Sequence, residues 1–107
     1  MMKRTNKTMV MVGWTTVSSK EDAVKIIEEL VQMNLIACGQ VSGPIESHYK
    51  WDDRVIKDTE WRVTLKYSQN KGPELIQEIM KLHPYEIPQW VSIKAESTEA
   101  YSNWVNQ

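Results

Sequence analysis

The first third of the chain combines a short apolar run with one amphipathic segment. Residues 8–14 are apolar without a helical period, and their β-branched content predicts a strand buried on both faces. Ser18 and Glu21 then have the spacing of a capping box, which predicts the start of a helix. Apolar side chains recur after it on one helical face: Ala23, Ile26, Ile27, Leu30 and Val31. Asn34 predicts a left-handed stop to this helix.

The middle of the chain predicts extended structure that doubles back on itself. Residues 35–41 form a second short apolar run, which predicts another buried strand. Residues 45–51 and 60–67 both alternate between apolar and polar side chains, and residues 52–54, Asp-Asp-Arg, lie between them as a turn. Together these stretches are typical of a long antiparallel hairpin.

The last third predicts a helix, a strand and a short helix. Residues 70–74, Asn-Lys-Gly-Pro-Glu, suit a helix start, because proline is favoured in the first turn and a carboxylate is stabilised near the positive end of the helix dipole. The apolar face that follows is Leu75, Ile76, Ile79, Met80 and His83. Pro84 predicts the helix end at about His83. Residues 89–95 predict a strand, and residues 97–99 open a last short helix.

The order of elements is therefore β-α-β-β-α-β-α. Because strand-helix-strand crossovers are right-handed, two such units joined by a hairpin predict an α+β, ferredoxin-like βαββαβ sandwich with a long hairpin between the second and third strands. We expect a single domain over residues 1–107, in which residues 1–7 form a flexible, basic tail. The two longer helices cover one face of the sheet. The other face carries part of an aromatic set of five tryptophans, which predicts that another subunit covers it.

Composition excludes several partners. With 13 basic and 14 acidic side chains the net charge is -1, which is unfavourable for binding nucleic acid or an anionic membrane. No apolar run approaches the roughly 20 residues that span a bilayer. The single cysteine, Cys38, cannot form an internal disulfide, and this favours a cytoplasmic location.

The segment His83-Pro84-Tyr85-Glu86-Ile87-Pro88 is a candidate site. Its two prolines make a stiff connection that holds an imidazole, a phenol and a carboxylate at the end of a helix. Two interpretations are open. In the structural one, His83 caps the last carbonyls of its helix and Tyr85 packs. In the functional one, His83 and Glu86 face a bound ion or ligand.

The same segment, together with others, resembles the CutA1 family of divalent-cation tolerance proteins, over about residues 8–105. The resemblance rests on Leu35-Ile36-Ala37-Cys38, Ser47-His48-Tyr49-Lys50-Trp51, Glu60, Lys66, the His83–Pro88 segment and Tyr101-x-x-Trp104. It implies a ferredoxin-like core, a homotrimer related in shape to PII signalling proteins, and, as in some members, a link to copper or other divalent ions. Where the family usually has Asn after Ala-Cys-Val, this chain has Gly39-Gln40, and its first strand lacks the cysteine of some metal-binding relatives.

The resemblance implies a site as well as a fold. Cysteine, histidine and carboxylate side chains are the ligands that copper and zinc accept. The candidates are Cys38, Glu60, His83 and Glu86, with copper expected first and zinc second. An intersubunit cleft is expected to be lined by Trp51, Lys66, Tyr85, Tyr101 and Trp104. We expect no organic cofactor.

The expected function is that of a trimeric divalent-cation tolerance protein that responds to metal ions and is not an enzyme. The alternative is a PII-like sensor trimer, in which Lys66 meets a small anionic ligand at the intersubunit cleft. An acylphosphatase-like enzyme is disfavoured, because residues 14–19 contain neither the Arg nor the Asn of that family's phosphate loop. RNA binding by an RRM-like sheet is disfavoured by the charge balance.

Overall fold

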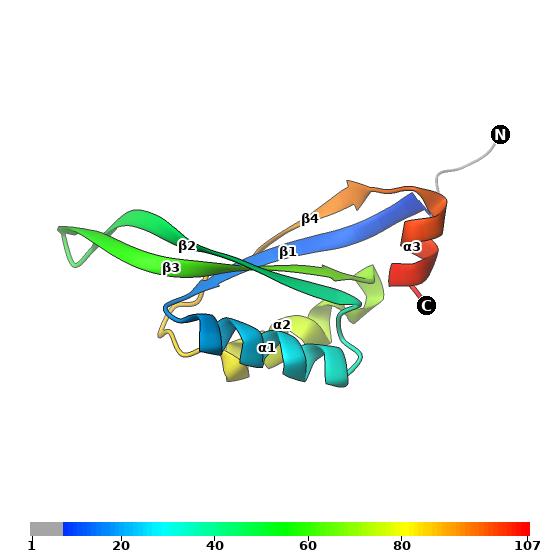
Figure 1. The fold of residues 1–107 in the computed structure, drawn as a ribbon, viewed down its shortest axis with the longest axis horizontal. Helices are drawn as coiled ribbons and strands as arrows, with labels where there is room; N and C mark the ends of the chain where they lie inside the picture. The colour runs from blue at the N-terminus through cyan, green and yellow to red at the C-terminus, as the bar shows by residue number, and fades with distance from the viewer. Residues whose placement is uncertain (1–7) are drawn as a thin grey trace.

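A computed structural model describes residues 8–107 and confirms the α+β, ferredoxin-like arrangement. One four-stranded antiparallel sheet has the order β2-β3-β1-β4, and α1 and α2 lie together against one of its faces (Figure 1). The elements are β1 (Met9–Val17), α1 (Lys20–Gln32), β2 (Cys38–Trp51), β3 (Arg54–Tyr67), the 3-10 turn η2 (Gln69–Lys71), α2 (Gly72–Leu82), β4 (Val91–Glu96) and α3 (Glu99–Val105). The predicted tail, residues 1–7, lies outside the described residues.

The helix ends follow local sequence signals, although α1 begins one residue later than its predicted capping box. The N-cap of α1 is Ser19, whose hydroxyl accepts from the Asp22 amide at 3.1 Å, so the predicted box at Ser18 and Glu21 is wrong by one residue. Asn34 has a φ of 59° and ends α1 in the left-handed conformation, as predicted. Fewer α2 side chains are buried than the apolar pattern predicts. Ile76 belongs to the predicted apolar face but is exposed.

The hairpin is longer than the alternating stretches alone indicate. The predicted strands 35–41 and 45–51 are one strand, β2, with an irregularity between Ser42 and Ile45 where the register against β3 shifts. Asp52 and Asp53 both have positive φ, at 52° and 61°, as a two-residue hairpin turn requires. The tip of the hairpin projects past the helices (Figure 1), and this accounts for the elongated dimensions of 54 × 29 × 23 Å.

The core lies between the helices and the facing side of the sheet. Val63 and Leu65 of β3 pack there with helix side chains, and the fully buried ones include Leu30, Leu75 and Ile79. Each such side chain contributes about 1.5–3 kcal/mol through burial. This core fixes the distance between α2 and the sheet, and with it the position of the loop that follows α2.

The opposite face of the sheet remains largely open. Strand alternation places Val12 and Trp14 of β1 on this face, beside Ile93 and Val91 of β4. Val91 and Ile93 are 51% and 50% exposed. The short helix α3 packs only at the end of the sheet where β1 begins (Figure 1). Among residues 8–107, no helix is long and apolar enough to cross a membrane.

Candidate functional site

The segment from His83 to Pro88 begins where α2 stops. His83 has a φ of -76° and a ψ of 133°, the extended conformation that a following proline imposes. Its backbone N–H donates to the Ile79 carbonyl at 2.9 Å, which closes the last turn of the helix. The chain therefore leaves α2 sharply at His83, and the imidazole turns toward the sheet.

Both ring nitrogens of His83 are engaged in hydrogen bonds. Nε2 lies 2.9 Å from the Thr16 carbonyl oxygen and 3.0 Å from Thr15 Oγ1, while Nδ1 accepts from the Tyr85 amide at 3.1 Å. A carbonyl can only accept, so Nε2 carries a proton. Because Nδ1 accepts a hydrogen bond, it carries no proton, and the ring is therefore neutral. Burial lowers the pKa of His83 below its usual value of 6.5, and the bond to Thr16 opposes that shift.

This geometry separates the interpretations of His83. The imidazole does not cap the carbonyls of α2; it joins the end of α2 to β1. It also has no ring nitrogen left over, because Nε2 donates and the lone pair of Nδ1 accepts. A metal ion would have to displace one of these bonds to bind His83 in this conformation.

Tyr85 extends the same network to β3. Its hydroxyl donates to Glu60 Oε2 at 2.8 Å, and its ring meets the His83 ring edge-on, with 4.8 Å between the centroids. Burial raises the pKa of Tyr85, and the hydrogen bond to the Glu60 carboxylate raises it further. Glu60 is itself buried, so its contact with Tyr85 is made away from bulk water.

A groove opens between Tyr85 and the half of the β2-β3 hairpin that lies next to its turn. This hairpin groove has a volume of about 310 Å³. It is lined by three aromatic side chains, two isoleucines, two carboxylates and two hydroxyl side chains, which are Tyr49, Trp51, Tyr85, Ile56, Ile87, Asp58, Glu86, Ser18 and Thr59. The Tyr49 hydroxyl donates to the Asp58 carboxylate, and this bond is the main cause that raises the pKa of Tyr49. Two of the predicted cleft residues, Trp51 and Tyr85, thus lie together with the predicted ligand Glu86.

The other predicted cleft residues form a second group, near α3. The ammonium of Lys66 lies 6.0 Å from the centre of the Tyr101 ring, and its Nζ donates to Gln40 Oε1 at 2.9 Å. The Tyr101 and Trp104 rings stack at a tilt, 5.7 Å apart. Cys38 pairs with Lys66 across β2 and β3, so its half-buried thiol belongs to this end of the sheet.

One chain does not bring these two groups together. Asp58 and Lys66 lie on the same strand, eight positions apart, which corresponds to roughly 26 Å along a strand. Among residues 8–107, no three His, Cys, Asp or Glu side chains are close enough to hold a metal ion. The four predicted ligands divide accordingly, with Glu60, His83 and Glu86 toward the hairpin and Cys38 at the far end.

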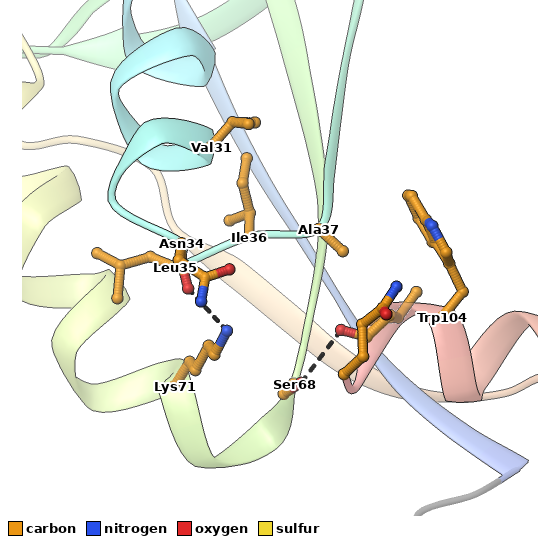
Figure 2. A pocket seen from close by; sticks show the side chains of 10 residues that line it. Val31, Asn34, Leu35, Ile36, Ala37, Ser68, Lys71 and Trp104 are labelled. Atoms are coloured by element: carbon orange, nitrogen blue, oxygen red, sulfur yellow. Dashed lines mark hydrogen bonds between the residues drawn. The ribbon is translucent and has the colours of Figure 1, made fainter.

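A second cavity, of about 280 Å³, lies where α1, the start of β2 and α3 meet. Figure 2 shows Lys71 directed at Asn34, whose carbonyl accepts from Lys71 Nζ at 2.7 Å, and Ser68 bonded to the Val105 carbonyl at 3.3 Å. These bonds hold the left-handed turn and α3 in place. Lys71 and Ser68 thus make hydrogen bonds within the fold, and the cavity lies where several elements pack together.

Comparison with known proteins places this architecture in a family. The family model described as CutA1 divalent ion tolerance protein matches residues 11–107, nearly the whole described chain. The chain belongs to the CutA1 family. The resemblance identified from the residue motifs is thereby confirmed.

One relative and two solved structures show how similar other proteins are to this CutA1 chain. It is 35% identical over 95 residues to the divalent-cation tolerance protein CutA of Thermotoga maritima, covering 88% of this chain and 93% of the relative. The solved structure of the divalent cation tolerance protein from Thermus thermophilus superposes with a TM-score of 0.87 at 32% identity, covering 91% of this chain and 95% of the other. CutA1 of Ehrlichia chaffeensis gives a TM-score of 0.87 at 28% identity, with 92% of each chain covered.

Two parts of the site in this CutA1 chain were not predicted from its sequence. The partners of His83 on β1, Thr15 and Thr16, have no signature in the local sequence. Tyr49 and Asp58 did have a signal, because a two-residue turn at 52–53 sets the hairpin register and places the two side chains near each other.

Proposed function

We propose that this CutA1 protein binds a divalent metal ion, copper first and zinc second, at a site completed between copies of the chain in the cytoplasm. Its relatives are named for divalent-cation tolerance and not for a reaction, which supports a binding role in the response to metal ions over an enzymatic one. The proposal that two copies of the chain share the site is supported by one observation: the two groups of candidate residues are far apart along β3 within a single chain.

The free ligand atoms support this division. Within residues 8–107, neither the Cys38 thiol nor the Glu86 carboxylate has a hydrogen-bond partner, whereas His83 and Glu60 are both engaged. Thiolate and carboxylate are both ligands for zinc and copper. A site that uses Cys38 of one copy and Glu86 of another therefore requires no rearrangement of the His83 network.

Self-association is supported by the open sheet face. Val12, Trp14, Val91 and Ile93 form an apolar strip that no helix within residues 8–107 covers; Val91 and Ile93 are exposed and the other two are half-buried. Monomers rarely expose a large apolar surface. We propose that the assembly is a homotrimer, in which the strip and the projecting hairpin meet neighbouring copies.

The test is calorimetric titration of the metal-free protein with Cu²⁺ and Zn²⁺. Cys38→Ser and Glu86→Gln should each weaken binding by about tenfold or more. If the two residues act from different chains, refolding an equimolar mixture of the variants should restore part of the tight sites. His48→Ala is the control, because His48 is exposed and bonded only to Glu46. Undiminished binding in both variants would reject these ligands.

A second candidate function is favoured by Lys66. Its ammonium lies beside the Tyr101 ring and donates a hydrogen bond to Gln40. A positive charge positioned in this way suits the binding of a small anion, as in a PII-like sensor. Titration with ATP and simple carboxylates tests this possibility. Binding of these anions that Lys66→Gln abolishes, with no binding of Cu²⁺ or Zn²⁺, would favour the sensor over the metal-binding protein.

A further inference from the structure

Glu60 is a carboxylate that the fold of one chain already buries. The residue is 8% exposed, and the Tyr85 hydroxyl donates to its Oε2 at 2.8 Å. A hydrogen bond to a charged acceptor is about twice as strong as one between neutral groups. Burial makes its loss costly, because water cannot freely replace the missing donor. Glu60 and Tyr85 therefore form a fixed pair within one chain.

Tyr85 is held at its backbone as well as at the tip of its side chain. Its amide donates to His83 Nδ1 at 3.1 Å, and its ring meets the His83 ring edge-on. The backbone of Tyr85 is thus fixed relative to the end of α2, and its hydroxyl is fixed relative to β3. The residue that follows Tyr85 starts from a defined point.

That following residue is Glu86, the proposed metal ligand. Glu86 is exposed, and its carboxylate has no hydrogen-bond partner within residues 8–107. Pro84 and Pro88 flank residues 85–87, and their fixed φ angles leave few backbone torsions free in this stretch. The direction of the Glu86 side chain therefore depends on how firmly Tyr85 is held.

We propose that Glu60 is a positioning residue, which acts through Tyr85 to hold the Glu86 carboxylate in place for a metal ion. This inference rests on the proposed function and deepens it, because it gives Glu60 a role other than that of a ligand. Metal ligands in proteins are commonly oriented by partners around them. The two roles make different demands. A ligand uses the negative charge of Glu60, whereas a positioning residue needs only an oxygen that accepts from the Tyr85 hydroxyl.

Two substitutions separate these roles in a calorimetric titration of the assembled, metal-free protein with Zn²⁺ alone. Glu60→Gln removes the charge and keeps an accepting oxygen, so Zn²⁺ affinity should change by less than about twofold. Tyr85→Phe keeps the charge of Glu60 and removes the hydrogen bond, so affinity should fall about fivefold. A Glu60 that ligates the metal predicts the reverse order, with Glu60→Gln weakening binding about tenfold or more.

The effect of Tyr85→Phe should pass through Glu86. In a Glu86→Gln background, Tyr85→Phe should weaken Zn²⁺ binding no further, because the carboxylate that Tyr85 positions is gone. A merely structural role of the pair would lower the affinity in both backgrounds. Tyr49→Phe is the matched control, since it removes another hydrogen bond from a tyrosine to a carboxylate, that of Asp58, and should leave Zn²⁺ affinity unchanged.

A second measurement needs no metal. In ¹⁵N relaxation of the metal-free protein, the amides of Glu86 and Ile87 should become more mobile in Tyr85→Phe on the ps–ns timescale. They should keep the mobility of the parent protein in Glu60→Gln and in Tyr49→Phe. Unchanged mobility in Tyr85→Phe would overturn the inference, and so would a larger loss of Zn²⁺ affinity in Glu60→Gln than in Tyr85→Phe.

The variants also distinguish this inference from the proposed function. If Glu86→Gln weakens Zn²⁺ binding and Tyr85→Phe does not, only the positioning role of Glu60 is rejected. If Glu86→Gln leaves Zn²⁺ binding intact, the proposed ligand is rejected, and the relaxation data then decide whether Glu60 and Tyr85 position Glu86.

Discussion

At the scale of single residues, His83 is the side chain that organises the candidate site. It is buried and neutral, and it connects three segments through Thr16, Thr15 and the Tyr85 amide. Tyr85 in turn holds Glu60. The His83 ring therefore determines where Tyr85 and the groove beside it lie, whether or not any ion ever contacts the ring itself.

This role predicts a pH-dependent stability. The pKa of His83 is lower in the folded chain than its usual 6.5, so below that value the unfolded chain binds more protons. The free energy of unfolding should therefore fall as pH drops from 7 through about 6.5 toward the folded-state pKa. Chemical denaturation at a series of pH values measures this.

The variant His83→Gln isolates the contribution of the imidazole. It should cost about 1–3 kcal/mol at pH 7, because the Tyr85 amide and the Thr16 carbonyl lose their partner. It should also remove most of the decline in stability between pH 7 and 5. If the variant and the parent protein decline in parallel, His83 is not the titrating group.

At the scale of elements, β1 meets the segment before β4 through a contact that only glycine allows. A Cβ built at Gly13 would lie 2.2 Å from the Trp90 ring, closer than any real contact. Trp90 also stacks at a tilt on Tyr67, with 6.1 Å between the ring centroids. The connection between Pro88 and β4 is thus anchored over the middle of β1.

Gly13→Ala should therefore destabilise the fold. Overpacking of this kind costs typically 1–3 kcal/mol, and here the ring of Trp90 must move. Gly72→Ala is the matched control, because its nearest contact would be an ordinary 3.7 Å and its φ of -54° suits any residue. The control should be neutral or about 0.4–1 kcal/mol more stable. Equal losses in both variants, by denaturation, would refute the packing argument.

At the scale of the whole molecule, the open sheet face sets the expected assembly. In the proposed homotrimer, Ile93→Glu should shift sedimentation from trimer toward monomer, because a charge would be buried among apolar side chains. Val31→Glu, which alters an equally exposed residue on α1, should leave the trimer intact. A folded monomer of the parent protein at micromolar concentration would contradict the proposal.

Local patterns were sufficient for most of the fold. The apolar period placed α1 and α2, the prolines at 73 and 84 marked the two ends of α2, and Asn34 marked the end of α1. The order of these elements, together with the right-handed crossover rule, predicted the topology. These signals are local because helix ends, turns and amphipathic faces depend on a few neighbouring residues.

The errors arose where a distant part of the chain decides the outcome. Ser42-Gly43-Pro44 resembles a break, yet β3 continues to pair on both sides of it, so β2 runs through. Ile76 follows the apolar period of α2 but lies exposed, because the sheet covers only part of that face. Pairing and burial of this kind depend on which elements become neighbours in the fold.

The candidate site shows most clearly which features the local sequence determines and which depend on the tertiary structure. The chain contains the chemical groups, and Pro84 and Pro88 make the connection around Tyr85 and Glu86 stiff. Only the tertiary structure joins His83 to Thr15, 68 positions away, and places Cys38 and Glu86 at opposite ends of one sheet. The physical reason is that hydrogen bonds and cavities depend on distances in space. Those distances are set by the order of strands in the sheet and not by spacing along the chain.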